Sequence, residues 1–201
     1  MSLRPALEHH LTARLVGGLL ALLLAACGDD AWRGTPVDGL LPDLEFRLLD
    51  TTGTPVEAER YRGKVTLLYF GFTNCPDICP TTLAQLGLAL ERLGPAAQGV
   101  QVLLATVDPA RDSPEALARY AGAFGPWLHG LTGSEAALRA LNQAYKVDFM
   151  AQEPDLAGRY DVMHSNRVFA FDREGRCRLL LPNATDTEAV VADLRRLLKQ
   201  G

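Results

Sequence analysis

The chain has 201 residues, a formal net charge of −4 and a hydrophobic fraction of 48%. This length suits one domain with a short appendage, and the apolar fraction is enough for a sizeable core. Charged residues are scattered and no basic run is interleaved with aromatic residues. The sequence therefore gives no electrostatic basis for binding nucleic acid, and we expect no such partner.

The first 26 residues have the pattern of an export signal. Arg4 and Arg14 charge the leading segment, and an apolar run follows over residues 15–26 and ends in small residues. The run is shorter than the roughly 20 apolar residues that a comfortable membrane-spanning helix needs. We therefore expect residues 1–26 to be a signal peptide.

The tetrapeptide Leu-Ala-Ala-Cys at residues 24–27 resembles the lipobox of bacterial lipoproteins. This resemblance implies cleavage before Cys27 and lipidation of its thiol, and two or more acyl chains hold a protein firmly to a bilayer. The alternatives are an ordinary cleaved signal peptide with an incidental cysteine, or an uncleaved anchor. With lipidation, residues 27–37 form a polar tether, and the protein lies on the periplasmic side of a bacterial membrane.

The rest of the chain alternates predicted strands with predicted helices. Short apolar or alternating runs predict strands at 44–49, 65–70, 100–107, 128–131, 168–171 and 176–181. Apolar spacing and capping residues predict helices at 81–93, 114–124, 134–145 and 186–200. The stretch 147–162 is predicted to be irregular and polar.

This order of elements predicts an α/β domain over residues 38–201. Strands alternating with helices favour a central mixed sheet flanked by helices on both faces. A closing hairpin followed by a helix is the order of the thioredoxin fold, here with a β-hairpin at the N-terminal side.

Cys75 and Cys79 lie in the loop 71–80, at the mouth of a predicted helix. The unpaired amides and positive dipole end of a helix N-terminus lower thiol pKa and favour the thiolate, the form that binds metal or attacks a disulfide. Three intervening residues permit a wider bite around a metal than a Cys-x-x-Cys turn does. From the pair alone, a structural disulfide or two small buried residues remain equally good interpretations.

Three ordered motifs are similar to those of one family. Residues 70–80, Phe-Gly-Phe-Thr-Asn-Cys-Pro-Asp-Ile-Cys-Pro, resemble the signature of the Sco/SenC copper chaperones. Residues 107–114 resemble that family's loop after the third strand, and residues 160–165 resemble the stretch that carries its histidine ligand. The resemblance covers roughly residues 37–198. It implies a thioredoxin-like fold, one copper ion and a role in maturing the dinuclear copper site of cytochrome c oxidase.

The resemblance also implies a ligand set. Cys75 and Cys79 would supply sulfur, and His164 would supply nitrogen. Cu(I) prefers soft thiolates and Cu(II) accepts imidazole, so this set serves both oxidation states. The implied partners are the copper-bearing subunit of cytochrome c oxidase or another copper-accepting protein, and other periplasmic copper chaperones.

The sequence departs from the family pattern beside His164. Family members often have an acidic residue immediately before the histidine, whereas this chain has Met163. A thioether is a possible soft copper ligand, although packing against the core is the better interpretation of Met163. Asp161 is a candidate to orient the imidazole in place of the missing acid.

Several nearby residues receive structural interpretations. Asp77 is expected at the helix start, where the dipole favours a carboxylate. Residues 108–112 contain two aspartates and one arginine that are expected to form an ion pair near the site. Cys177 is expected to be a buried, inert thiol, and His129 has no matching motif and is interpreted as a structural residue.

The alternative function is a thiol-disulfide oxidoreductase that reduces cysteines of a periplasmic target protein. It would use Cys75 and Cys79 as a redox-active disulfide and catalytic pair, and it does not need His164. A metallochaperone, in contrast, has no turnover. A peroxidase of the peroxiredoxin type is weaker, because Thr73 has the required spacing from Cys75 but no matching arginine is evident.

Overall fold

The computed structural model describes residues 31–147, 149–151, 162–164, 166–181, 184 and 186–200, with the side chains of 149–151 and 162–164 outside this description. The predicted signal peptide, Cys27 and Asp161 fall outside these ranges. Within them, no helix is both long enough and apolar enough to cross a membrane.

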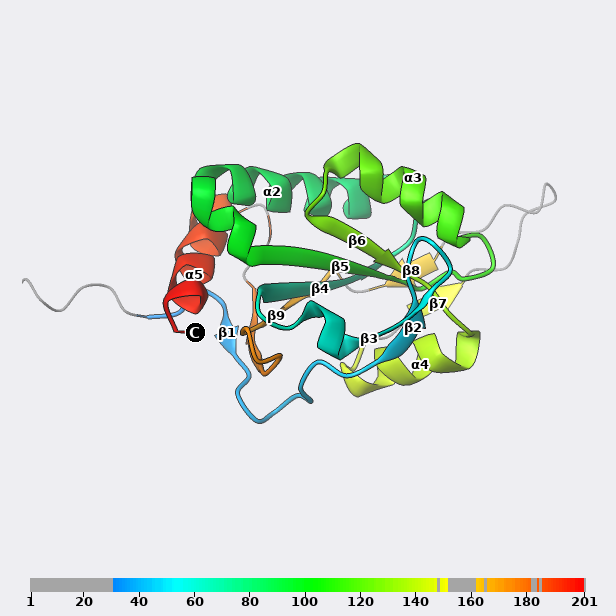
Figure 1. The fold of residues 1–201 in the computed structure, drawn as a ribbon, viewed down its shortest axis with the longest axis horizontal. Coiled ribbons are helices and arrows are strands. Elements are labelled where there is room, and N and C mark those ends of the chain that lie inside the picture. Colours follow the sequence, from blue (N-terminus) through cyan, green and yellow to red (C-terminus); the bar gives the residue numbers. More distant parts are fainter. Residues whose placement is uncertain are drawn as a thin grey trace, which may run out of the picture. The chain divides into compact units, whose positions relative to one another are not determined.

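Six strands form a mixed central sheet (Figure 1). They are β1 (Thr35–Pro36), β4 (Val65–Gly71), β5 (Val100–Thr106), β6 (Leu128–Leu131), β9 (Val168–Phe171) and β10 (Cys177–Leu180). Their order is β1-β10-β9-β4-β5-β6. The pairs β4–β5 and β5–β6 are parallel, whereas β9, β10 and β1 pair antiparallel. Every residue of β4 and β5 is buried, as expected of strands covered on both faces.

Helices cover the sheet on both sides. They are α2 (Ile78–Leu93), α3 (Pro114–Phe124), α4 (Glu135–Ala144) and α5 (Thr187–Lys199), with 3-10 helices η1 (Ala58–Tyr61) and η2 (Gly94–Gly99). Helix α2 contacts both α3 and α5, and Figure 1 shows α4 on the opposite side of the sheet from α2 and α3. The thioredoxin-like arrangement of a mixed sheet flanked by helices is therefore confirmed.

The predicted capping residues determine where two of these helices begin. The Ser113 hydroxyl accepts a hydrogen bond from the amide of Ala116, and the Ser134 hydroxyl accepts one from Ala137. Each bond satisfies an amide that has no partner inside its helix. The predicted strands at 128–131 and 168–171 agree with β6 and β9 residue for residue.

Two hairpins lie outside the central sheet. Strands β2 (Arg47–Leu49) and β3 (Pro55–Glu57) form the predicted N-terminal hairpin. Strands β7 (Phe149–Ala151) and β8 (Val162–His164) also pair antiparallel, although 147–162 was predicted to be irregular. That prediction was wrong at both ends of the stretch, because strands of three residues are too short to show an alternating pattern.

The folded domain begins before the predicted boundary at residue 38. Thr35 and Pro36 pair with β10, and Val37 is buried. Just upstream, the buried carboxylate of Asp193 on α5 accepts hydrogen bonds from the amides of Arg33 (2.8 Å) and Gly34 (2.7 Å). The last residues of the predicted tether are therefore part of the domain, because backbone hydrogen bonds attach them to β10 and α5.

Candidate metal centre

The cysteine pair lies where β4 passes into α2. The Cys75 amide donates to the Phe72 carbonyl at 3.2 Å, which closes a tight turn, and Asp77 is the N-cap residue of α2 as predicted. Cys79 lies in the first helical turn, and its amide donates to the Cys75 sulfur at 3.3 Å. Both cysteines are free thiols. The helix start therefore brings the two cysteines together, with a backbone donor directed at one sulfur.

The two thiols differ in exposure. Cys75 is half-buried, whereas Cys79 is completely buried. Gly71 leaves room for the Cys79 sulfur, because a Cβ atom at residue 71 would lie only 3.0 Å from that sulfur. Cys75 is therefore the cysteine that a partner can reach, and Cys79 lies behind it.

Burial raises the pKa of the Cys79 thiol to about 12. The nearby hydroxyl of Tyr69 acts in the opposite direction but does not overcome burial. The expectation that the helix start makes this thiol acidic is wrong for Cys79, because desolvation of the charged form outweighs the helix dipole. A cation bound beside the sulfur would offset that desolvation, because an opposite charge favours the thiolate.

A buried carboxylate holds the cysteine loop in place. Asp112 accepts hydrogen bonds from the Thr73 hydroxyl at 2.6 Å, from the Thr73 amide at 3.1 Å and from the Thr106 hydroxyl at 2.6 Å. Because β4 and β5 are parallel and Gly71 is opposite Thr106, the loops that follow them leave the same edge of the sheet. Asp112 thus ties the loop of Cys75 to the end of the neighbouring strand.

The predicted ion pair includes one of the two aspartates. Arg111 pairs with Asp108, and its guanidinium also lies over the Phe72 ring, 5.6 Å from the centroid. Asp112 instead binds threonines, so its inclusion in the ion pair was wrong. The hydroxyls and amide that surround Asp112 come from two other strand ends, and the local sequence gave no sign of that contact.

Two tyrosines beside the cysteines were missed. Tyr69 lies on β4, two residues before Gly71, and therefore on the same face of the strand. The hydroxyl of Tyr120 on α3 is buried and has no hydrogen-bond partner among the described residues. Burial, and then the charges of Cys79, Cys75 and Asp112, raise the pKa of Tyr120. Side chains alternate between the two faces of a strand, so the position of Tyr69 on the face of Gly71 could have been predicted. No local signal indicated Tyr120.

His164 ends strand β8, where its backbone is opposite Phe149 of β7. The side chains of His164 and Met163 are outside the described part of the chain. In the view of Figure 1, the β7–β8 pair and the start of α2 lie towards the same end of the sheet. Among the described side chains, no three His, Cys, Asp or Glu residues lie close enough together to hold a metal ion.

The remaining predicted residues lie away from the cysteine pair. Cys177 on β10 is buried, and burial raises its pKa to about 12, in agreement with an inert thiol. His129 on β6 is half-buried and its ring packs against Tyr61, with the centroids 5.8 Å apart. Thr73 is engaged with Asp112, which leaves no peroxidase-type arrangement around Cys75 among the residues described.

A mixed sheet flanked by helices, with a cysteine pair in the first turn after its central strand, defines the thioredoxin-like class. The model of the SCO1/SenC family matches residues 41–199. The chain therefore belongs to the SCO1/SenC family.

The relatives and solved structures agree with this assignment. The mitochondrial SCO2 homolog of Bos taurus is 38% identical over 154 residues, which are 76% of this chain and 58% of that protein. The solution structure of apo Sco1 from Thermus thermophilus is 41% identical, with a TM-score of 0.75, over 85% of this chain and 99% of the other. Copper-bound ScoI from Bradyrhizobium japonicum is 33% identical, with a TM-score of 0.69, over 83% and 99%. This chain thus spans less than two thirds of the mitochondrial relative but nearly all of the structural neighbours.

Proposed function

We propose that this protein is a copper metallochaperone that binds one copper ion through Cys75, Cys79 and His164. Its role would be to help assemble the dinuclear copper site of cytochrome c oxidase. The observation that carries the proposal is the close approach of two free thiols at the start of α2, in a family that includes copper-bound structures.

The buried Cys79 thiol keeps its proton at neutral pH until a metal ion displaces it. A cation beside Cys79 would favour its thiolate, which burial alone disfavours. Two thiolates satisfy Cu(I), and an added imidazole would satisfy Cu(II). Metal binding at this site is therefore expected to release protons, and the affinity is expected to increase with pH.

The difference in exposure fits transfer to another protein. Half-buried Cys75 would meet an incoming ligand from the copper-accepting subunit, while buried Cys79 would be the last to release the ion. Asp112 holds Thr73, two residues before Cys75, so the start of the cysteine loop is already positioned. Other periplasmic copper chaperones are the proposed donors.

We also propose lipid anchoring at Cys27 on the periplasmic side of a bacterial membrane. The support is the lipobox-like tetrapeptide after the predicted signal peptide 1–26. Residues 27–31 would then connect the lipid to the domain, because Arg33 and Gly34 are already bonded to Asp193. Labelling with radioactive palmitate tests this, since Cys27→Ala should abolish incorporation and no incorporation into the parent would refute it.

The alternative, a thiol-disulfide oxidoreductase, has weaker support. Such enzymes attack with a thiolate, and burial raises the pKa of Cys79 far above neutral pH. Cys75 would have to be the attacking group. Reduction of a model disulfide at the same rate by His164→Ala and the parent, together with unchanged copper binding, would favour the oxidoreductase.

Copper titration of the full-length protein in detergent tests the metal site. We expect about one copper per chain, with sulfur-to-Cu(II) charge-transfer absorption that Cys75→Ser abolishes. Cys177→Ser is the matched control, because that thiol lies on β10 away from the pair, and it should bind like the parent. Equal loss of absorption in both variants would contradict the assignment.

A further inference from the structure

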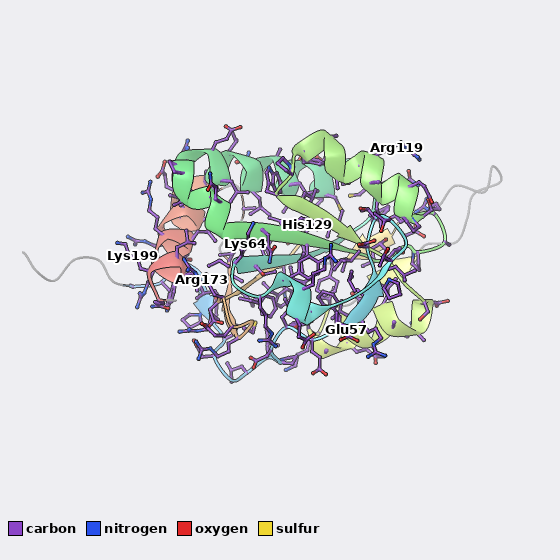
Figure 2. The ribbon with its side chains drawn as sticks, in the orientation of Figure 1. Glu57, Lys64, Arg119, His129, Arg173 and Lys199 are labelled. Atoms are coloured by element: carbon purple, nitrogen blue, oxygen red, sulfur yellow. The ribbon has the colours of Figure 1, made fainter. Side chains whose placement is uncertain are left out.

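A pocket lies at the edge of the sheet opposite the cysteine loop. It has a volume of about 360 Å³ and is lined by Asp50, Thr51, Thr52, Arg60, Tyr61, Lys64, Gln101, His129 and Gly130. Lys64 directly precedes β4, and His129 is the second residue of β6, so the pocket lies near the amino ends of the parallel strands. Figure 2 shows Lys64 and His129 on the same side of the molecule.

The pocket carries an excess of positive charge. Neither Arg60 nor Lys64 has an ion-pair partner among the residues that the structure describes. The acid in the lining, Asp50, accepts hydrogen bonds from the amides of Thr52 (2.8 Å) and Thr54 (3.1 Å) and is held in its own turn. Two cations therefore face one anion that is already engaged by donors.

Hydrogen bonds and a ring contact hold one wall of the pocket together. Gln101 is buried and its amide nitrogen donates to the Tyr61 carbonyl and to the Thr66 hydroxyl, the latter at 2.9 Å. The Tyr61 ring in turn packs against the His129 ring at 5.8 Å between centroids. The imidazole thus packs on Tyr61 and lines the same pocket as the two cations. Such preorganisation lowers the entropic cost of binding a small ligand.

The imidazole reports on the same charges. Burial, and then the charges of Lys64 and Arg60, lower the pKa of His129. Asp50 and Tyr61 are the other titratable groups that line the pocket with the His129 ring. An anion between the cations would reverse the electrostatic contribution, because an opposite charge favours the protonated imidazole.

We propose that this pocket binds a phosphate-type oxyanion, held by Arg60, Lys64 and His129. A guanidinium presents two parallel N–H groups to such an anion, and an ammonium adds a point charge. The ligand is either free phosphate or the phosphodiester of a lipid headgroup, which share this chemistry. The pocket is independent of the cysteine site.

The test is an NMR titration of the full-length protein in neutral detergent. Inorganic phosphate is added at constant ionic strength, and the imidazole signals of His129, assigned with His129→Gln, are followed. We expect a saturable shift, and a His129 pKa that is higher by about one unit at saturation. A parallel titration uses glycerophosphoglycerol, the water-soluble headgroup of phosphatidylglycerol. The ligand that binds more tightly identifies the source as free phosphate or a lipid headgroup.

Paired variants make the result specific. Lys64→Ala and Arg60→Ala should each weaken binding at least tenfold. Lys199→Ala, an exposed lysine at the end of α5 (Figure 2), and Arg119→Ala, an exposed arginine on α3, should bind like the parent. Shifts that do not saturate with either ligand, or that persist unchanged in Lys64→Ala and Arg60→Ala, would overturn the proposal.

Discussion

Replacing Asp112 should loosen the cysteine loop. The carboxylate is buried and accepts three hydrogen bonds, two of them from Thr73, which lies two residues before Cys75. Asp112→Ala removes all three and leaves the Thr106 hydroxyl without an acceptor for its hydrogen. Asp112→Asn keeps the shape of the side chain and one acceptor oxygen.

The magnitude follows from these contacts. Hydrogen bonds to a charged group contribute about 1.5–3 kcal/mol each, and the loop amide of Thr73 can recover part of its loss by binding water. We therefore expect Asp112→Ala to lower the free energy of unfolding by about 3 kcal/mol, and Asp112→Asn by about half as much. Urea unfolding followed by far-ultraviolet circular dichroism gives both values.

Copper affinity separates support of the site from general stability. Groups that orient metal ligands typically change metal affinity by about 10–100-fold when they are removed. Asp193→Ala is the matched control, because Asp193 on α5 is equally buried and also accepts hydrogen bonds, in its case from two backbone amides. It should lower stability to a similar extent and leave copper affinity unchanged. Equal copper affinities for Asp112→Ala and the parent would refute a positioning role for Asp112.

Three further predictions concern stability and the environment of the cysteines. Gly71→Ala should destabilise the fold by about 1–3 kcal/mol in urea unfolding, because its Cβ would lie 3.0 Å from the Cys79 sulfur and 3.1 Å from Leu104; an unchanged midpoint would show that the strand can shift. Tyr69→Phe should raise the pKa of Cys79 further, because it removes the nearby hydroxyl that lowers this pKa. A thiol reagent should then react more slowly with Cys79 at a given pH, and a faster reaction would contradict this. Burial tends to raise the pKa of Asp172, but hydrogen bonds from two neighbouring arginines outweigh it and lower that pKa below its ordinary value of 3.8. The stability that the Asp172 carboxylate contributes is therefore present above pH 3.8 and is lost as the pH falls through the folded-state pKa. Unfolding measured from pH 6 to pH 2 should show that loss, and Asp172→Asn should show less of it.

Most of the fold could be predicted because local signals agree with tertiary structure. The apolar runs of β4 and β5 are buried on both faces, and Ser113, the predicted capping residue, caps α3. The β7–β8 pair could not be predicted, since its two strands are three residues long and separated by a polar stretch. Register between such strands depends on contacts distant in sequence.

The site divides in the same way. The spacing of Cys75 and Cys79 and the position of Asp77 at a helix start are local, and they were predicted, although the helix begins at Ile78 and not at residue 81. The pKa of Cys79 could not be predicted from its position in the helix, because it depends on how deeply the packed fold buries the thiol. The contacts of Asp112 with Thr73 and Thr106 arise only when two parallel strands end side by side. Site features that lie within one segment can be predicted from the sequence, whereas contacts between distant segments cannot.

The most direct test of the copper site is electron paramagnetic resonance of the Cu(II)-loaded full-length protein, read for hyperfine coupling to histidine nitrogen. We predict coupling to one imidazole in the parent protein and in His129→Ala, whose ring packs against Tyr61 rather than near the cysteines. His164→Ala should lose that coupling and bind Cu(II) much more weakly. Nitrogen coupling and affinity that are unchanged in His164→Ala would contradict the proposed ligand set.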